Sequence, residues 1–175
     1  MGFIEVLINQ IIALDNNIDK YFIDFQLPWL LKIMKILTHI GSALLCWILY
    51  ASFFIFFNDS LGIFLITIIS GEIMLLCSVI ILRNITKRKR PVSEINYKNA
   101  ILKWNNYSFP SLHSARMFML TFLIAKNYHK LMLVILSIAI IISFSRIYIR
   151  KHYMSDVLIG SVIGIFSGAI AYYSF

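Results

Sequence analysis

The feature that most constrains this chain is a series of long apolar runs. Residues 61–82 contain a single charged residue, Glu72, and residues 131–149 contain only Arg146. Because a helix of about 20 apolar residues crosses the hydrocarbon layer of a bilayer, each run is long enough to span a membrane. Of the 175 residues, 60% are hydrophobic and 14% are charged, which leaves too little charge to cover a soluble domain. The sequence therefore predicts an all-α, multi-pass membrane protein that forms one domain over residues 1–175.

The apolar runs predict about five transmembrane spans. We expect them at residues 37–57, 61–82, 111–125, 131–149 and 155–173. Between the second and third, residues 83–110 are polar and basic and predict a loop. Successive spans cross in opposite directions, so the end of the second span, the start of the third, the end of the fourth and the start of the fifth share one side of the membrane. These four points lie near Arg83, Ser111, Arg146 and Asp156. Their polar neighbours are therefore expected to converge.

The N-terminal segment, residues 1–27, has a different pattern, because apolar side chains recur on one face of a helix and polar side chains fill the other. The apolar face comprises Ile4, Leu7, Ile8, Ile11, Ile12, Ile18, Phe22 and Phe25, and the polar face comprises Glu5, Asn9, Gln10, Asp15, Asn16 and Asp19. A helix of this kind lies on a membrane surface rather than crossing it. We therefore expect an interfacial amphipathic helix before the first span.

Three polar clusters occur at the converging ends, in residues 83–91, 110–114 and 145–156. Together they supply several Arg, two His, Ser hydroxyls and sparse carboxylate. Arg donors match the oxygens of a phosphate, and the N–H groups and dipole at a helix start favour anions. Two His and one Asp could ligate zinc, but the surrounding cations would repel a metal ion. The clusters therefore predict a phosphate site with no metal and no other cofactor. In a membrane chain, the net charge of +8 indicates anionic lipid or phosphate as the partner rather than nucleic acid.

Two histidines, His113 and His152, would lie beside a phosphate bound there, which suggests a nucleophile and an acid. His152 and Asp156 stand at positions i and i+4, so on a helix the carboxylate can hold one nitrogen of the imidazole ring. The other ring nitrogen is then aimed as a nucleophile, as in a catalytic triad.

The three clusters resemble the three signature motifs of the type 2 phosphatidic acid phosphatase family of membrane lipid phosphatases. The first motif, K-x6-R-P, is matched by Arg83, six residues and Arg90-Pro91; the second, P-S-G-H, by Pro110-Ser111-Leu112-His113; the third, S-R-x5-H-x3-D, by Ser145-Arg146, His152 and Asp156. The resemblance runs from the THIGS stretch at residue 38 to residue 160. Two positions depart from the pattern. Arg83 replaces Lys, which keeps the charge but changes its reach, and Leu112 replaces Gly, which restricts close approach of a phosphate.

The resemblance implies a role for each matched residue. His152 attacks phosphorus and forms a phosphohistidine, with Asp156 in support, while His113 protonates the leaving oxygen and later activates water. The phosphate oxygens are held by Arg83, Arg90, Arg146, Ser111 and the Leu112 N–H. Such donors offset the charge on the transferring phosphoryl group, so the family requires no metal.

These roles imply an enzyme of the plasma (inner) membrane, a metal-independent phosphatase whose substrate is a lipid phosphate. Bacterial relatives with similar motifs act on phosphatidylglycerophosphate, phosphatidic acid, undecaprenyl pyrophosphate or the 1-phosphate of lipid A, and the sequence does not select among them. Two alternatives stay open. A lipid phosphotransferase would pass the same phosphoryl group to an acceptor hydroxyl. A non-catalytic scaffold that binds anionic lipid would have no use for the spacing of His152 and Asp156.

The side of the membrane is indicated by two conflicting patterns. Most Lys and Arg lie on the face that carries the motifs, and the positive-inside rule would place that face in the cytoplasm. The family works on the outer face instead. Because phosphate binding explains many of these cations, we expect the motif face outside.

Five further charged residues require interpretation. Lys87, Arg88 and Lys89 predict a solvated or lipid-headgroup patch. Glu72 and Arg116 fall within predicted spans, where ionisable residues are costly and usually paired or functional. We expect these two to face the interior of the bundle; a neutral Glu72 that hydrogen-bonds to a neighbouring helix is the alternative.

Overall fold

The computed structural model describes residues 3–42, 45–48, 61–92, 97–99 and 102–175. Over these residues the chain consists of helices and connecting loops, with no strand, which confirms the all-α class. The α-helices are α1 (Phe3–Asp24), α2 (Pro28–Leu37), α4 (Leu61–Thr86), α5 (Leu112–Asn127), α6 (Met132–Tyr148) and α7 (Met154–Ser174). Short 3-10 helices η1 (Thr38–Gly41), η2 (Lys103–Asn106) and η3 (His129–Leu131) lie in the connections.

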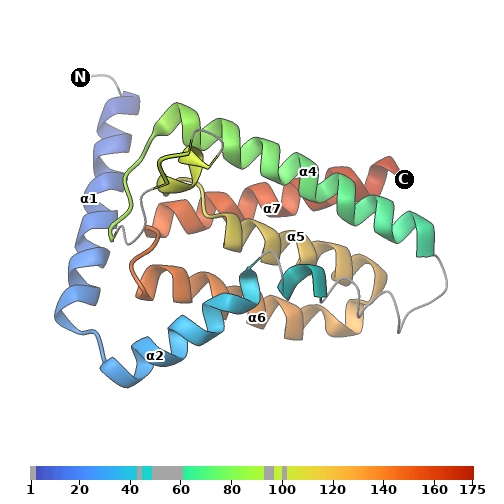
Figure 1. Cartoon of the computed structure of the whole chain (residues 1–175), viewed down its shortest axis with the longest axis horizontal. Coiled ribbons are helices and arrows are strands. Elements are labelled where there is room, and N and C mark those ends of the chain that lie inside the picture. The colour runs from blue at the N-terminus through green and yellow to red at the C-terminus, as the bar shows by residue number, and fades with distance from the viewer. Residues whose placement is uncertain (1–2, 43–44, 49–60, 93–96, 100–101) are drawn as a thin grey trace.

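Helices α4 to α7 run side by side as a bundle (Figure 1). α5 packs against α7 and α6 and, less extensively, against α4, while α4 also packs against α7. The interior is apolar, with Ile68, Leu75 and Met119 fully buried. Large apolar side chains also cover the outside, where Leu133 and Phe166 are more than half exposed. A bundle that is apolar both inside and outside is suited to lipid rather than to water.

Within the described part of the chain, three helical segments are long and apolar enough to cross a membrane: Gly62–Thr86, His129–Tyr148 and Met154–Ser174. They correspond to the spans expected at residues 61–82, 131–149 and 155–173. The chain is therefore an integral, multi-pass membrane protein. The segment expected at residues 111–125 forms α5, whose 16 residues make it shorter than these three. Of the span expected at residues 37–57, residues 43–44 and 49–57 lie outside the described residues. α4 continues to Thr86, so Arg83 lies on a helix and the loop expected at residues 83–110 begins one turn later.

Glycines on α7 allow it to approach α5 closely. A Cβ atom at Gly160 would lie 2.4 Å from the carbonyl oxygen of Ser111, and one at Gly164 would lie 2.0 Å from that of Ala115. Backbones come this near only where a side chain is missing, as in the small-residue seams of membrane helices. The seam fixes the start of α5 relative to the start of α7, where two of the polar clusters lie.

α1 crosses one end of the bundle at a steep angle to the other helices (Figure 1). Its apolar side chains, among them Leu7 and Ile8, are exposed. Two residues of its polar face contact protein: Asp15 is fully buried, and Asp19 forms an ion pair with Arg150. Sequence alone gave no partner for these carboxylates, because the arginines that attract them lie far along the chain.

Candidate active site

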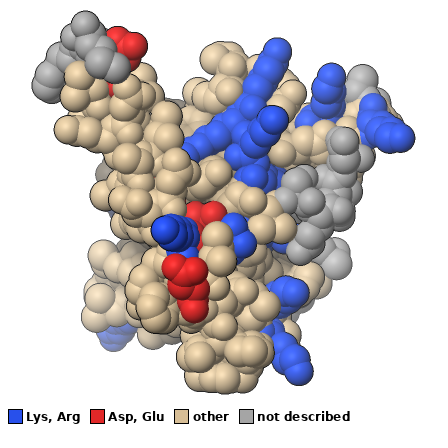
Figure 2. All heavy atoms as spheres, turned by 90° about the vertical axis from the view of Figure 1, so that its left-hand side faces the viewer, with Lys and Arg blue, Asp and Glu red and all other residues tan. Residues whose placement is uncertain are grey.

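A pocket of about 410 Å³ lies at the end of the bundle that α1 crosses. It is lined by Leu76, Arg83, Arg90, Val92, Tyr97, Trp104, Asn105, Leu112, His113, Arg116, Arg146, Lys151 and His152. Among these residues there are four Arg, one Lys and two His but no carboxylate. Figure 2 views this end, where Lys and Arg show at several separate places and Asp and Glu at fewer. The pocket is therefore suited to an anion.

Arg83 reaches the pocket from the last turn of α4 and is held in place by the loop that follows. Its Nε and Nη2 donate to the carbonyl oxygen of Pro110 over 3.3 and 3.1 Å, and its Nη1 donates to Asn105 Oδ1 over 3.0 Å. The guanidinium also lies over the ring of Trp104, 5.2 Å from its centroid. With 1% of its surface exposed, Arg83 is a buried, fixed positive charge in the pocket wall.

Arg90 lies opposite the nucleophile expected from the sequence. Its Nη2 donates to the carbonyl oxygen of Asn105 over 2.9 Å, and its Nη1 donates to that of Lys151 over 3.4 Å. The same Nη1 is 3.5 Å from His152 Nε2. Asn105 thus holds both Arg83 and Arg90. Asn105 could not be identified from the sequence, because it is one of several asparagines in a polar loop, with no spacing that distinguishes it.

Arg146 comes from the last turn of α6 and completes the set of arginines predicted for phosphate. Its Nη1 donates to Thr38 Oγ1 over 2.7 Å, so η1 positions this side chain. Thr38 belongs to the THIGS stretch that was noted in the resemblance. The structure therefore brings all three predicted arginines into one pocket.

His152 lies in the connection between α6 and α7 and is 1% exposed. Its Nε2 is the nitrogen near Arg90, while its Nδ1 lies 3.6 Å from Asp156 Oδ2. Burial, together with the positive charges of Arg146, Arg90 and Arg83, holds the pKa of the imidazole well below its ordinary value of 6.5. The ring is therefore neutral near pH 7, and a neutral ring with its proton on Nδ1 leaves a lone pair on Nε2 that faces the pocket.

The prediction that His152 and Asp156 share a helix is wrong. α7 begins at Met154, so His152 precedes it and only Asp156 lies on its first turn. Asp156 Oδ2 instead accepts a hydrogen bond from the backbone N–H of Tyr153 over 2.9 Å, as a residue that caps a helix start does. This hydrogen bond holds the carboxylate at the start of α7, and from there Oδ2 reaches the imidazole of His152. The two groups remain neighbours through the tight turn rather than through helical spacing.

The second predicted cluster forms the start of α5. Ser111 caps this helix by accepting the backbone N–H of Ser114 at 3.5 Å, and its own N–H donates to the carbonyl oxygen of Asp156 over 2.9 Å. Ser111 is fully buried and is not among the residues that line the pocket. Leu112 and His113, which follow it, do line the pocket. The structure therefore places two of these three residues where a bound anion could meet them.

Glu72 and Arg116 form an ion pair between α4 and α5. Arg116 Nε donates to Glu72 Oε2 over 3.0 Å, and both side chains are buried. This confirms the expectation that they face the interior. Arg116 also lines the pocket, which adds a fourth arginine that the three motifs do not contain.

The interpretation of residues 87–89 as a solvated patch is wrong for its central residue. Lys87 and Lys89 are exposed, but Arg88 is turned inward. Its Nη1 donates to Asp156 Oδ1 over 2.8 Å, and its Nη2 donates to Asp15 Oδ2 over 2.7 Å. Two carboxylates draw this arginine away from the pocket, and neither could be identified from the basic run alone.

Comparison with known proteins gives the family. The profile of the PAP2 superfamily matches residues 59–175, more than half of the chain. The chain belongs to the PAP2 superfamily. It is therefore a membrane phosphatase of the class that the three motifs predict, a lipid phosphate phosphatase of a metal-independent family.

Individual relatives agree with this family. Phosphatidylglycerophosphatase B of Bacillus subtilis (strain 168) is 28% identical in an alignment of 172 positions, which covers 90% of this chain and 81% of that protein. The crystal structure of Aquifex aeolicus LpxE matches with a TM-score of 0.72 at 23% identity, over 93% of this chain and 94% of that one. The crystal structure of a transmembrane PAP2 type phosphatidylglycerolphosphate phosphatase from Bacillus subtilis matches with a TM-score of 0.75 at 21% identity, over 94% and 86%. At these identities the two structures show that the PAP2 fold is shared.

Proposed function

We propose that this phosphatase removes a phosphate from a membrane lipid through a phosphohistidine on His152. The observation that carries the proposal is the position of His152 Nε2 in a pocket that also contains Arg83, Arg90, Arg146 and His113. The candidate substrates are phosphatidylglycerophosphate, lipid A 1-phosphate, phosphatidic acid and undecaprenyl pyrophosphate. The first two are supported by the names of the relatives, phosphatidylglycerophosphatase B and LpxE.

The reaction follows from these positions in two steps. In the first, the Nε2 lone pair of His152 forms a bond to phosphorus while the bond from phosphorus to the lipid oxygen breaks, and His113 gives its proton to that oxygen. In the second, His113 takes a proton from water, the water oxygen attacks phosphorus, and the bond to Nε2 breaks. Inorganic phosphate is released, and both histidines return to their starting protonation states.

Arginines and backbone donors stabilise the charge that develops on the phosphoryl oxygens. We assign this role to Arg83, Arg90 and Arg146, with the Leu112 N–H. Ser111 contributes by capping α5, so that the N–H groups of its first turn face the same region. Asp156 supports His152 by its negative charge, 3.6 Å from Nδ1. No step in this scheme requires a metal.

The architecture that we propose is a single membrane-embedded domain over residues 1–175, with about five spans and an interfacial helix within residues 1–27, where α1 (Phe3–Asp24) lies. α5 would be a short span that begins at the site, and the segment at residues 37–57 would supply the first span. The connection within residues 83–110 would cover the site. We place the protein in the plasma (inner) membrane, with the site on the outer face.

Phosphate release from the four lipids tests the proposal. The purified protein in detergent would be assayed with a chelator present, beside His152→Ala and beside His129→Ala as a control at the opposite end of the bundle. We expect release from at least one lipid, its loss in His152→Ala and its retention in His129→Ala. Phosphate that appears only on an added acceptor alcohol would instead indicate a phosphotransferase. Lipid binding without turnover, which also survives loss of both pocket histidines, would indicate a scaffold.

A further inference from the structure

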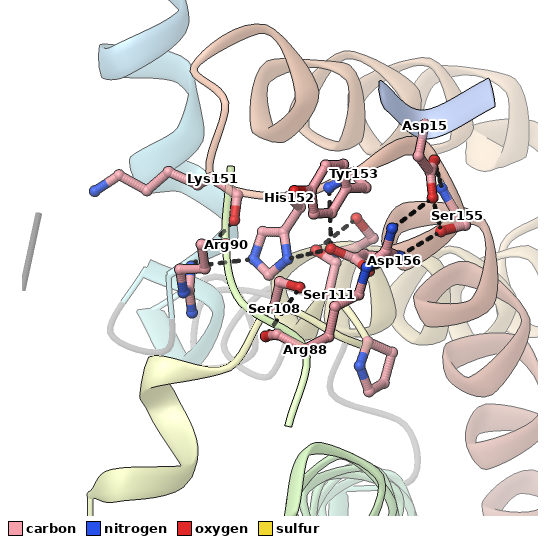
Figure 3. Close-up of polar contacts among 12 residues, drawn as sticks. Asp15, Arg88, Arg90, Ser108, Ser111, Lys151, His152, Tyr153, Ser155 and Asp156 are labelled. Atoms are coloured by element: carbon pink, nitrogen blue, oxygen red, sulfur yellow. Dashed lines mark hydrogen bonds and ion pairs between the residues drawn. The ribbon is translucent and has the colours of Figure 1, made fainter. Parts of the chain in front are cut away.

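A carboxylate of α1 is buried directly behind the reaction centre. Asp15 is 0% exposed, although it lies on a helix whose other face is open. A buried carboxylate is costly unless each oxygen has a donor. Asp15 Oδ1 accepts the backbone N–H of Ser155 over 3.0 Å, and Oδ2 accepts Ser155 Oγ–H and Arg88 Nη2–H (Figure 3). The carboxylate is therefore fully engaged with two segments that lie far from it in sequence.

Arg88 connects this carboxylate to a second one. Its Nη2 lies 2.7 Å from Asp15 Oδ2 and its Nη1 lies 2.8 Å from Asp156 Oδ1, and Nη1 also donates to Ser155 Oγ over 2.7 Å. The guanidinium is stacked on the ring of Tyr153, 4.0 Å from its centroid. Both carboxylates are fully buried, so the arginine between them offsets the repulsion of their negative charges. Asp156 can keep its place beside His152 because Arg88 is held from the other side.

The carboxylate of Asp15 also caps the start of α7. Ser155 is the second residue of α7, whose first N–H groups have no partner within the helix. Asp15 satisfies one of them from another helix, and a negative charge at this end also favours the helix dipole. Asp156 satisfies the N–H of Tyr153. The turn that follows His152 is therefore fixed by Asp15 on one side and by Asp156 on the other.

We propose that Asp15 is a positioning residue for the reaction, which acts through Arg88 and Ser155 to hold Asp156 and His152 in place. The inference rests on the proposed role of His152. Asp15 does not line the pocket, so it contacts neither substrate nor the reacting atoms. Asp15 should therefore affect the orientation of His152 Nε2 toward phosphorus rather than the binding of the phosphate.

Asp15→Asn removes the negative charge of the side chain and keeps its shape. Asparagine fills the same space, but its NH₂ group cannot accept from Arg88 or Ser155. We expect kcat to fall about tenfold, as when the partner that orients a reactive ligand is removed, with KM changed less than twofold. Asp15→Glu, which restores the carboxylate, should recover most of kcat. Ser155→Ala, which removes one hydroxyl of the network, should give an intermediate loss.

Asp19→Asn is the matched control on the same helix. Asp19 pairs with Arg150 through two bonds of 2.8 and 2.9 Å and so attaches α1 to the loop before His152, but it has no contact with Asp156. If α1 acted only as an anchor, both Asn variants would lower the melting temperature and kcat alike. We expect the loss of kcat in Asp15→Asn alone. Equal losses in the two variants, or a lower melting temperature of Asp15→Asn with normal kcat, would overturn the inference.

Orthovanadate provides a readout that does not depend on the lipid. A five-coordinate vanadate mimics the transition state and requires an aimed Nε2, whereas inorganic phosphate requires the arginines alone. We expect Asp15→Asn to weaken vanadate about tenfold and phosphate less than twofold, with no change in Asp19→Asn. Vanadate binding without lipid turnover would reject the proposed function and still test Asp15. An unmodified protein that neither binds vanadate nor turns over lipid would overturn both.

Discussion

Replacing Gly164 with alanine tests whether the seam between α5 and α7 sets the geometry of the site. The new Cβ would lie 2.0 Å from the carbonyl oxygen of Ala115, whereas Cβ atoms essentially never come within 3.0 Å of a neighbour. Both partners are backbone of helices, so neither can turn aside as a side chain would. The helices must therefore separate by about 1 Å, and overpacking of this kind costs about 1–3 kcal/mol of stability.

The separation matters for activity because the seam is continuous with the reacting groups. His113 lies on the first turn of α5, and His152 lies two residues before the start of α7. A rigid shift of one helix changes the distance between the proposed acid and the proposed nucleophile by a similar amount. Since a misplacement of about 1 Å can cost about 100-fold in rate, we expect kcat to fall to that extent while the protein remains folded in detergent.

A graded series of glycine variants makes the test specific. The Cβ of Gly160→Ala would meet the Ser111 carbonyl oxygen at 2.4 Å, that of Gly168→Ala would meet the Met119 carbonyl oxygen at 3.2 Å, and that of Gly62→Ala would have nothing within 4 Å. Activity should therefore be lost strongly at Gly160 and Gly164, little at Gly168 and not at Gly62. Phosphate release and melting temperature would be measured on each. Normal kcat in Gly164→Ala, or equal loss at all four positions, would refute the reasoning.

Three further predictions follow from single contacts. Glu72→Gln leaves Arg116 without its charge partner at membrane depth and should lower the free energy of unfolding by about 3 kcal/mol, which thermal unfolding in detergent would detect; an unchanged melting temperature would contradict the pairing. Because the folded pKa of His152 is depressed below 6.5, the unfolded chain binds the proton first, so stability should fall as the pH drops below that value. A pH series of melting temperatures should show a weaker acid slope in His152→Gln, and equal slopes would argue against a neutral imidazole. Arg90→Lys keeps the charge but cannot contact Asn105 and face His152 together, so kcat/KM should fall about tenfold; a value within twofold of the unmodified enzyme would remove Arg90 from the site.

The convergence of distant residues at one end of the bundle can be predicted from the lengths of the apolar runs and the number of crossings alone. The length of each apolar run defines a crossing, and alternate crossings bring Arg83, Arg146 and His152 to one end without any knowledge of packing. The structure agrees on those helices and places these side chains in one pocket. The place of Glu72 within a predicted span also predicts that its side chain faces the interior of the bundle, because a charge at membrane depth must find a partner.

Contacts between distant charges could not be predicted in this way. Arg88 lies in a basic run, and its partners Asp15 and Asp156 are 73 and 68 residues away. Nothing in the run distinguishes the arginine that turns inward from the lysines beside it. The start of α7 at Met154 agrees with the span expected from residue 155, but the four-residue spacing of His152 and Asp156 suggested a helical relation that this start excludes. The local signal was also weak, because a capping sequence would have Ser or Thr before the first turn and Tyr153 occupies that position.

The contacts of α1 have a consequence for the order in which the protein can mature. α1 precedes the other described helices in the chain, but Asp15 is separated from Ser155 by 140 residues and Asp19 from Arg150 by 131. The helix must therefore wait at the membrane until nearly the whole chain has been inserted before it can dock. If synthesis stops before α7, α1 cannot dock and the turn after His152 does not form. The site is therefore completed only when α1 docks, which must wait until Ser155 has been made.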